Sequence, residues 1–168
     1  MKILFISLGC DKNLADSEEM LGLLTGNGHE IVDSEEEADA IVINTCCFIH
    51  DAKEESVNTI LEMAEYKKTG TCKILIVTGC MAQRYKEEIT EEIPEVDAVL
   101  GTTSYGDIVK ALNEAEAGHV FRNSKMINAL PEDSGRRVIT TGGHFGYLKI
   151  AEGCDKHCTY CYHSFAER

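Results

Sequence analysis

The sequence has few basic side chains, no apolar run of membrane-spanning length, and no repeated or low-complexity segment. Its 16 lysines and arginines are outnumbered by 29 acidic residues, which gives a formal net charge of −13. Binding to a phosphate backbone requires clustered lysine and arginine, so this composition argues against nucleic acid as the direct partner. It fits a basic protein partner better. The lack of a long apolar run argues against a membrane-spanning helix.

The cysteine content is also too low for a disulfide-rich secreted scaffold, since eight cysteines are spread over 168 residues. The apolar run at residues 3–8 is too short for a secretory signal. We therefore expect a cytoplasmic protein with reduced thiols, in which clustered cysteines bind metal or take part in catalysis. With 43% apolar residues the chain can bury a core.

Strand and helix signals alternate through the first 117 residues. Short apolar runs predict strands, and apolar residues spaced three and four apart predict helices. Asp16 with Glu19 has the spacing of an amino-terminal capping pair, and Gly26 and Gly118 mark helix ends. The expected strands are residues 2–8, 29–33, 38–45, 73–78 and 98–100, and the expected helices are residues 16–25, 51–68, 83–93 and 107–117.

This alternation predicts an α/β fold with a doubly wound, parallel, five-stranded sheet. Continuously apolar strands indicate burial on both faces between two layers of helices. We expect the strand order 2-1-3-4-5. The composition divides the chain into a domain over residues 1–118, a linker over residues 119–145, and the start of a second domain over residues 146–168, with a further strand at residues 145–151.

Three cysteines each follow a predicted strand: Cys10, Cys46 and Cys80. Their strands are neighbours in the expected order, and parallel strands end at one edge, so the thiols should meet there. Helix amino termini face that edge and favour thiolates. The pattern predicts a metal or iron–sulfur site, although each cysteine alone would also fit a small buried residue at a strand end. We expect Cys47 to point elsewhere and Cys72 to lie at the opposite edge.

A second group, Cys154, Cys158 and Cys161, has the spacing C-x-x-x-C-x-x-C. Three such thiolates can hold three irons of a four-iron cluster and leave the fourth iron open to a substrate or cofactor. A zinc site is the alternative, with His157 or His163 as the fourth ligand. A redox C-x-x-C would leave Cys154 without a role.

The second group, with Tyr160 before its last cysteine, resembles the cluster motif of radical S-adenosylmethionine (SAM) enzymes. The chain more broadly resembles the methylthiotransferase family of these enzymes. Residues 10–13, Cys-Asp-Lys-Asn, are similar to the branch that modifies a ribosomal protein rather than to the branch that modifies tRNA. The other segments that carry the resemblance are residues 7–18, 44–46, 77–80 and 147–161.

The resemblance implies two [4Fe-4S] clusters and SAM as cofactors. It places one cluster and SAM on the second cysteine group with Tyr160 nearby, and the other cluster on Cys10, Cys46 and Cys80. It implies methylthio transfer to the β-carbon of an aspartate on the twelfth small-subunit ribosomal protein, with an electron donor protein as a further partner. The alternatives are a tRNA adenosine methylthiotransferase and a non-catalytic iron–sulfur or zinc-binding module.

The residues after Cys161 depart from the family, which places Ile-Ile-Pro there. Read one base later, codons for Tyr162-His163-Ser164 can encode Ile-Ile-Pro. We therefore expect a frame change that truncates an otherwise normal enzyme and leaves only the first strand of its radical SAM barrel. With no barrel to join, residues from about 123 onward should pack loosely, and we expect no turnover by this chain alone.

Overall fold

The computed structural model describes residues 1–126, 135–151, 154, 156 and 158–160. They form a parallel sheet of six strands in the order β2-β1-β3-β4-β5-β6. The strands are β1 (Lys2–Ser7), β2 (Glu30–Val32), β3 (Ala40–Thr45), β4 (Ile74–Gly79), β5 (Ala98–Leu100) and β6 (Phe121–Asn123). The helices are α1 (Asp11–Gly26), α2 (His50–Thr69), α3 (Cys80–Arg84), α4 (Lys86–Glu92) and α5 (Ile108–Glu116), with short 3-10 turns η1 (Glu35–Glu37) and η2 (Tyr105–Asp107).

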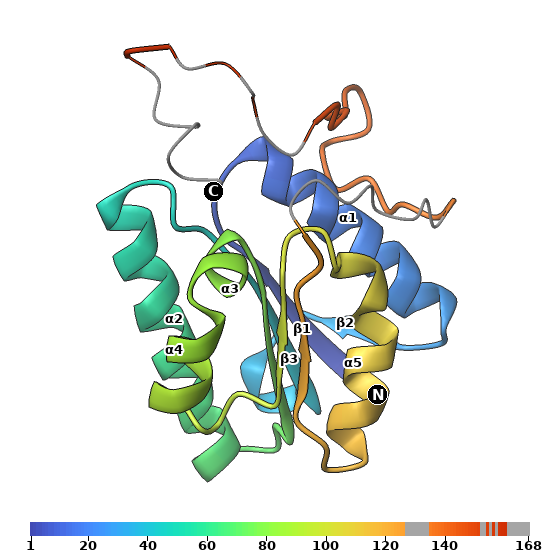
Figure 1. Ribbon diagram of the computed structural model, residues 1–168. Coiled ribbons are helices and arrows are strands. Elements are labelled where there is room, and N and C mark those ends of the chain that lie inside the picture. Colours follow the sequence, from blue (N-terminus) through green and yellow to red (C-terminus); the bar gives the residue numbers. More distant parts are fainter. Residues whose placement is uncertain (127–134, 152–153, 155, 157, 161–168) are drawn as a thin grey trace.

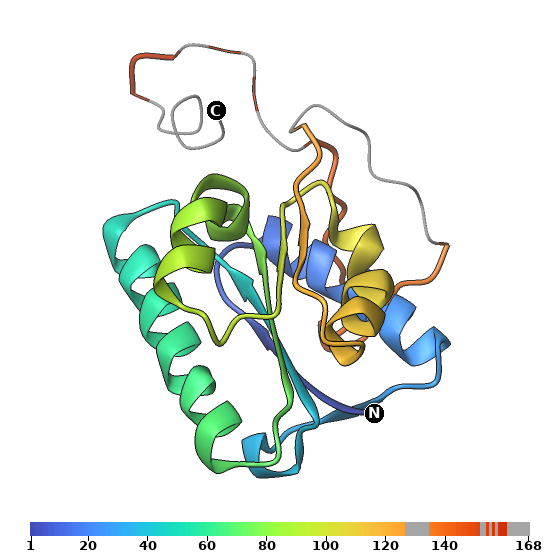
Figure 2. The same ribbon diagram turned by 60° about the horizontal axis from the view of Figure 1, so that its bottom comes forward.

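Helices cover both faces of the sheet (Figures 1 and 2). Helices α2, α3 and α4 lie on one face, and α1 and α5 lie on the other. Every residue of β3 and β4 is buried, because these central strands have a helix layer on each side. Among these residues no helix is both long and apolar enough to span a membrane.

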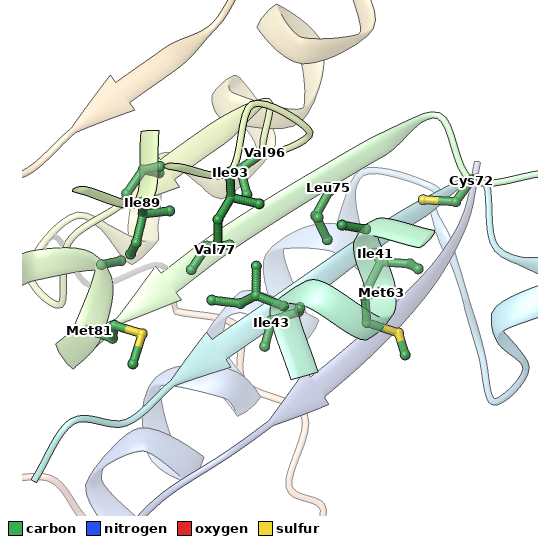
Figure 3. Close-up of a cluster of buried hydrophobic side chains, with 14 of the residues drawn as sticks. Ile41, Ile43, Met63, Cys72, Leu75, Val77, Met81, Ile89, Ile93 and Val96 are labelled. Carbon is green, nitrogen blue, oxygen red and sulfur yellow. The ribbon is translucent and has the colours of Figure 1, made fainter. Parts of the chain in front are cut away.

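Each helix layer has its own apolar cluster against the sheet. The cluster under α2, α3 and α4 includes Ile43, Met63 and Ile89 (Figure 3). The cluster under α1 and α5 includes Leu24 and Leu112, which are fully buried. Burying one such side chain stabilises the fold by about 1.5–3 kcal/mol.

The predicted order of the first five strands is confirmed, and the sheet has a sixth strand at its edge. Strand β6 lies inside the expected linker and runs parallel to β5, with Ala98 opposite Phe121 and Leu100 opposite Asn123. The N–H of Gly101 continues this pairing by donating to the carbonyl of Asn123 at 2.9 Å. One of the three residues of β6 is apolar, so no hydrophobic pattern marks it in the sequence.

Two predicted helices have different bounds. Helix α1 begins at Asp11 rather than at Asp16, and the predicted capping pair of Asp16 and Glu19 is wrong because Asp16 lies buried inside the helix. Its carboxylate instead accepts from the ammonium of Lys149 at 2.7 Å, a contact with a residue far along the chain. The predicted helix at residues 83–93 is divided at Tyr85 into α3 and α4.

The chain beyond β6 does not form the expected strand at residues 145–151, because no described strand lies beside it to pair with. Residues 136–149, here called the return segment, run along α1 instead (Figures 1 and 2). The segment bonds through polar groups to buried side chains of α1, whereas its apolar side chains Val138, Ile139, Phe145 and Leu148 are exposed. The expected loose packing beyond residue 123 is therefore confirmed for the apolar contacts of this segment and wrong for its polar ones.

Candidate metal centre

The parallel sheet brings Cys10, Cys46 and Cys80 to one edge. Cys46 directly follows β3, Cys80 directly follows β4, and Cys10 follows β1 after a two-residue turn. Strand β3 lies between β1 and β4, and all three strands run in the same direction. The three cysteines therefore share the carboxyl edge, where open α/β sheets bind their ligands. This placement agrees with the prediction from strand order.

Two glycines allow the loops at this edge to approach closely. Gly9 has φ of +106°, and a Cβ there would fall 2.8 Å from the Cβ of Cys46 and 3.1 Å from its sulfur. Gly79 has φ of +94°, and a Cβ there would fall 2.5 Å from the carbonyl oxygen of Thr45. Side chains rarely adopt this backbone conformation, and neither position has room for one. The loops after β1 and β4 are thus packed directly against the end of β3.

The side chain of Asn13 joins the three loops. Its amide nitrogen donates to the carbonyl oxygens of Leu8 at 3.1 Å and Thr45 at 2.9 Å. Its amide oxygen accepts from the thiol of Cys80 at 3.5 Å, and the residue is 1% exposed. Sequence reasoning missed this role, although Asn13 stands in the Cys-Asp-Lys-Asn segment that carried the family resemblance. No rule of sequence spacing links Asn13 to Thr45 and Cys80, which lie 32 and 67 positions later in the chain.

Further buried polar groups fix the backbone around Cys46 and Asn13. The hydroxyl of Ser56, on α2, accepts from the N–H of Cys46 at 3.0 Å and donates to its carbonyl at 2.9 Å. The amide nitrogen of Asn44 donates to the carbonyl of Asn13 at 2.8 Å and to the hydroxyl of Ser17 at 2.9 Å. These groups satisfy one another in a region closed to water.

The thiols differ in their surroundings. Cys10 is exposed, Cys46 is buried, and Cys80 is partly covered. Burial raises the pKa of Cys80 to about 12; the ammonium of Lys12 lowers that pKa, and the nearby thiols of Cys47, Cys46 and Cys10 raise it. A bound cation would reverse the pKa shift, because it pairs with the thiolate.

The other two cysteines of this domain have different positions. Cys47 is buried within the apolar cluster under α2, and burial, then the thiol of Cys46, raises its pKa. Its thiol is nonetheless close enough to affect Cys80. Cys72 lies before β4, at the opposite end of that strand from Met81, as Figure 3 shows. Its thiol donates to the carbonyl of Ile74 at 3.3 Å, so its predicted distance from the three-cysteine edge is confirmed.

The donor set suits an iron–sulfur cluster by its chemistry. Within the described part of the chain no group of three or more histidine, cysteine, aspartate or glutamate side chains closes around a single ion position. A cluster has a different requirement, because each thiolate binds a separate iron and the ligands stand further apart than around one ion. A structural zinc ion needs four ligands around one position, whereas three thiols from three loops can each bind a separate iron, so this donor set fits a cluster better.

The second cysteine group is only partly described. Cys154 and Cys158 are exposed, and Tyr160 is 90% exposed. Cys161 lies outside the described residues, as do the alternative ligands His157 and His163. The role of this group as cluster ligands stays a prediction.

Comparison with known proteins gives one consistent result. A family model described as "Uncharacterized protein family UPF0004" matches residues 2–101. The chain is 65% identical over 161 residues to a protein of Lachnoclostridium phytofermentans named "Ribosomal protein uS12 methylthiotransferase RimO". It is 50% and 51% identical to proteins of the same name from Clostridioides difficile and Acetivibrio thermocellus. These alignments cover 96%, 96% and 95% of this chain but 37%, 36% and 37% of those relatives.

Proposed function

This chain belongs to the uncharacterized protein family UPF0004, and we propose that it forms the amino-terminal part of a radical SAM methylthiotransferase acting on ribosomal protein uS12. The names of relatives that are between 50% and 65% identical support this proposal. The chain spans little more than a third of the length of those relatives. The methylthio transfer reaction is therefore proposed for a protein of the relatives' full length, of which this chain would form the amino-terminal part.

The observation that carries the proposal is the position of three cysteines after three adjacent parallel strands, at the carboxyl edge of the sheet. One buried cysteine at a strand end would need no function, but three on adjacent strands provide a set of iron ligands. The proposed ligands of the first [4Fe-4S] cluster are Cys10, Cys46 and Cys80, and those of the second are Cys154, Cys158 and Cys161. When bound, the two clusters would supply one-electron chemistry and open irons for SAM and for sulfur.

The residues around the first three thiols have defined tasks in this proposal. Asn13 holds the loops after β1, β3 and β4 together through its bonds to Leu8, Thr45 and Cys80. Ser56 fixes the backbone of Cys46. The ammonium of Lys12 favours the thiolate form of Cys80. Together they would hold the three sulfurs in place before a cluster binds, and the bound irons would then favour the thiolate forms.

We place the domain that holds the first cluster at residues 1–118, the linker at residues 119–145, and the start of the SAM-binding domain at residues 146–168. The first residues of this linker contribute β6 to the sheet of the first domain. Tyr160, in the aromatic position of the second motif, would lie beside SAM. Its exposure leaves its ring available for such a contact.

The charge of the chain supports a basic protein as substrate. A net charge of −13 attracts a basic ribosomal protein and repels tRNA. The proposal includes an electron donor protein and a cytoplasmic location, where the thiols of a cysteine-based metal site stay reduced.

Anaerobic reconstitution of the purified chain with iron and sulfide tests the cofactor part of the proposal. We expect iron and labile sulfide in equal amounts, with visible absorption from thiolate-to-iron charge transfer. Zinc binding without sulfide uptake would instead favour a zinc module.

Titration of the reconstituted chain with uS12 and with tRNA at one salt concentration tests the substrate class. Tighter binding to uS12 is expected, and tighter binding to tRNA would overturn that part.

A further inference from the structure

The carboxylate of Glu18 lies buried on α1, where it binds the return segment (residues 136–149). Glu18 is 0% exposed, in the third turn of the helix. Its Oε2 accepts from Nε of Arg137 at 2.8 Å and from Nη2 of the same side chain. Its Oε1 accepts from the N–H of Thr140 at 2.6 Å and from the hydroxyl of Thr140 at 2.8 Å. Every donor comes from residues about 120 positions later in the chain.

The backbone of the return segment also bonds to α1. The N–H of Val138 donates to the carbonyl oxygen of Glu18 at 3.0 Å. Closer to the carboxyl end of α1, a Cβ at Gly22 would collide with the backbone of Arg136, so a glycine there permits the approach. Arg136 also donates to the carbonyl of Gly26 at 3.4 Å.

Later residues of the segment bind closer to the amino end of α1. The ammonium of Lys149 donates to both carboxylate oxygens of Asp16, at 2.7 and 2.9 Å, and both side chains are largely buried. Tyr147 interacts with Asp11, in the first turn of α1. The segment therefore runs from the carboxyl end of α1 towards its amino end, which follows Cys10.

This path has a chemical consequence for the second cysteine group. A buried carboxylate is costly in free energy unless a cation pairs with it. The buried position of Glu18 is therefore stable only when Arg137 of the return segment is bound to it. The return segment ends five residues before Cys154. Anchoring it on α1 restricts how far Cys154 can move from the helix whose amino end carries Cys10.

We propose that Glu18 is a positioning residue, which anchors the return segment on α1 through Arg137 and Thr140 and so sets where the second cysteine group stands relative to the first. The attachment of the return segment to α1 does not depend on any catalytic activity. The effect of this attachment on the relative position of two clusters rests on the proposed function. Asp16 with Lys149 forms the second point of attachment.

Two measurements on the 168-residue chain test the anchor. The first is hydrogen–deuterium exchange of residues 136–149, compared with residues of β3 and β4. The second is zero-length carbodiimide cross-linking, which joins a carboxylate to an amine in direct contact. The reporter link is Asp16 to Lys149, at 2.7 Å, and the internal control is Asp97 to Lys67, at 2.6 Å, on the far side of the sheet.

Arg137→Gln removes the cation on the segment side and leaves α1 unchanged. We expect exchange of the Val138 and Thr140 amides, which both donate to Glu18, to rise at least about tenfold, because a buried carboxylate loses its partner. The Asp16–Lys149 link should fall at least about fivefold while the Asp97–Lys67 link stays constant. Arg137→Lys should partly restore the slow exchange and the Asp16–Lys149 link, because it returns a positive charge without the bidentate geometry of a guanidinium.

A purely stabilising role would lower the melting temperature and leave the ratio of the two links unchanged, and that result would overturn the proposal. If Arg137→Gln fails to fold, Thr140→Val provides the same test with a smaller change, since it removes one hydroxyl donor. An unchanged ratio in Thr140→Val would then overturn it. Neither measurement uses iron, SAM or uS12, so failure of the anchor and failure of the proposed function are separate results.

Discussion

Asn13 and Thr45 are joined by a buried hydrogen bond of 2.9 Å, from the side-chain amide of one to the backbone carbonyl of the other. The same side chain accepts from the thiol of Cys80 at 3.5 Å. The parallel sheet brings the three cysteines to one edge, and Asn13 fixes the spacing between the loops that carry them. Stability at this edge and ligand placement therefore depend on the same residue.

Replacing Asn13 tests this dependence. Asn13→Ala removes a donor from the buried carbonyl oxygen of Thr45 and from the partly buried carbonyl oxygen of Leu8, so we expect the free energy of unfolding to fall by about 2–4 kcal/mol. Urea denaturation measures the change. The control is Asn27→Ala, which removes a 2.8 Å bond to the carbonyl of Leu23 at the exposed end of α1 and should cost less than about 0.5 kcal/mol. Equal losses in the two variants would contradict the account.

The close approach at Gly79 gives a second prediction. Gly79→Ala places a methyl group against Thr45 in a backbone conformation that alanine rarely adopts, and we expect a loss of at least about 3 kcal/mol. Gly118→Ala is the matched control, because Gly118 has φ of +80° but nothing within 4 Å of the added carbon. It should cost about 1–2 kcal/mol from the backbone alone. Thermal denaturation of the two variants separates the steric clash at Gly79 from the backbone cost that both variants share. Equal losses of stability would show that the loop after β4 moves to accommodate the methyl group.

The fold was predictable because each central strand carries a local signal. Strands β3 and β4 are continuous apolar runs, and their alternation with amphipathic helices determines a parallel sheet with neighbouring strands one, three and four. That order places Cys10, Cys46 and Cys80 at one edge before any coordinates are known. The short strand β6 lacks such a signal, because its pairing is made by backbone groups at the sheet edge.

The contacts between distant segments were not predictable. The local rule assigned Asp16 to a capping pair with Glu19, and no pattern in the sequence singled out Glu18. The true partners of Asp16 and Glu18, Lys149 and Arg137, lie more than 100 residues away. Asn13 was missed for the same reason, since its partners are on the loops after other strands. Sequence spacing describes local geometry and contains no information on which distant residue will fill a buried site.

The thiol surroundings predict unequal reactivity in the metal-free chain. With a pKa of about 12, Cys80 has at pH 8 roughly a thousandfold less thiolate than an ordinary cysteine. Iodoacetamide should therefore modify exposed Cys10 well before Cys80, as mass spectrometry of digests would show. The rate at Cys80 should rise about tenfold per pH unit above pH 8. Equal rates at Cys10 and Cys80 would mean that the edge is open to solvent.

The anchor of the return segment should weaken in acid. Burial would raise the pKa of Glu18, but the bonds from Thr140 and Arg137 hold it below the ordinary value. A lowered folded-state pKa contributes stability that is fully present above the ordinary glutamate pKa of about 4.3 and is lost as pH falls through the lower folded value. The protection of the Val138 amide, corrected for intrinsic exchange and compared with amides of β3, should disappear in that range.

Arg137→Gln provides the control for this pH dependence. Without the guanidinium the pKa of Glu18 rises, so the loss of Val138 protection should move to higher pH. A transition that stays in place would show that another group controls the segment. The groups that face the carboxylate are Arg137 and the N–H and hydroxyl of Thr140, of which only Arg137 is ionic.

The central claim is that three strands of one sheet provide a cluster site of their own. Iron and labile sulfide counts on the variant Cys154→Ala, Cys158→Ala, Cys161→Ala test it most directly, because this variant keeps Cys10, Cys46 and Cys80. After anaerobic reconstitution we predict about half of the iron held by the unaltered chain. Adding Cys10→Ala should then remove that iron, whereas adding Cys72→Ala should not. Absence of iron from the first variant, or equal loss with Cys10→Ala and Cys72→Ala, would contradict the account.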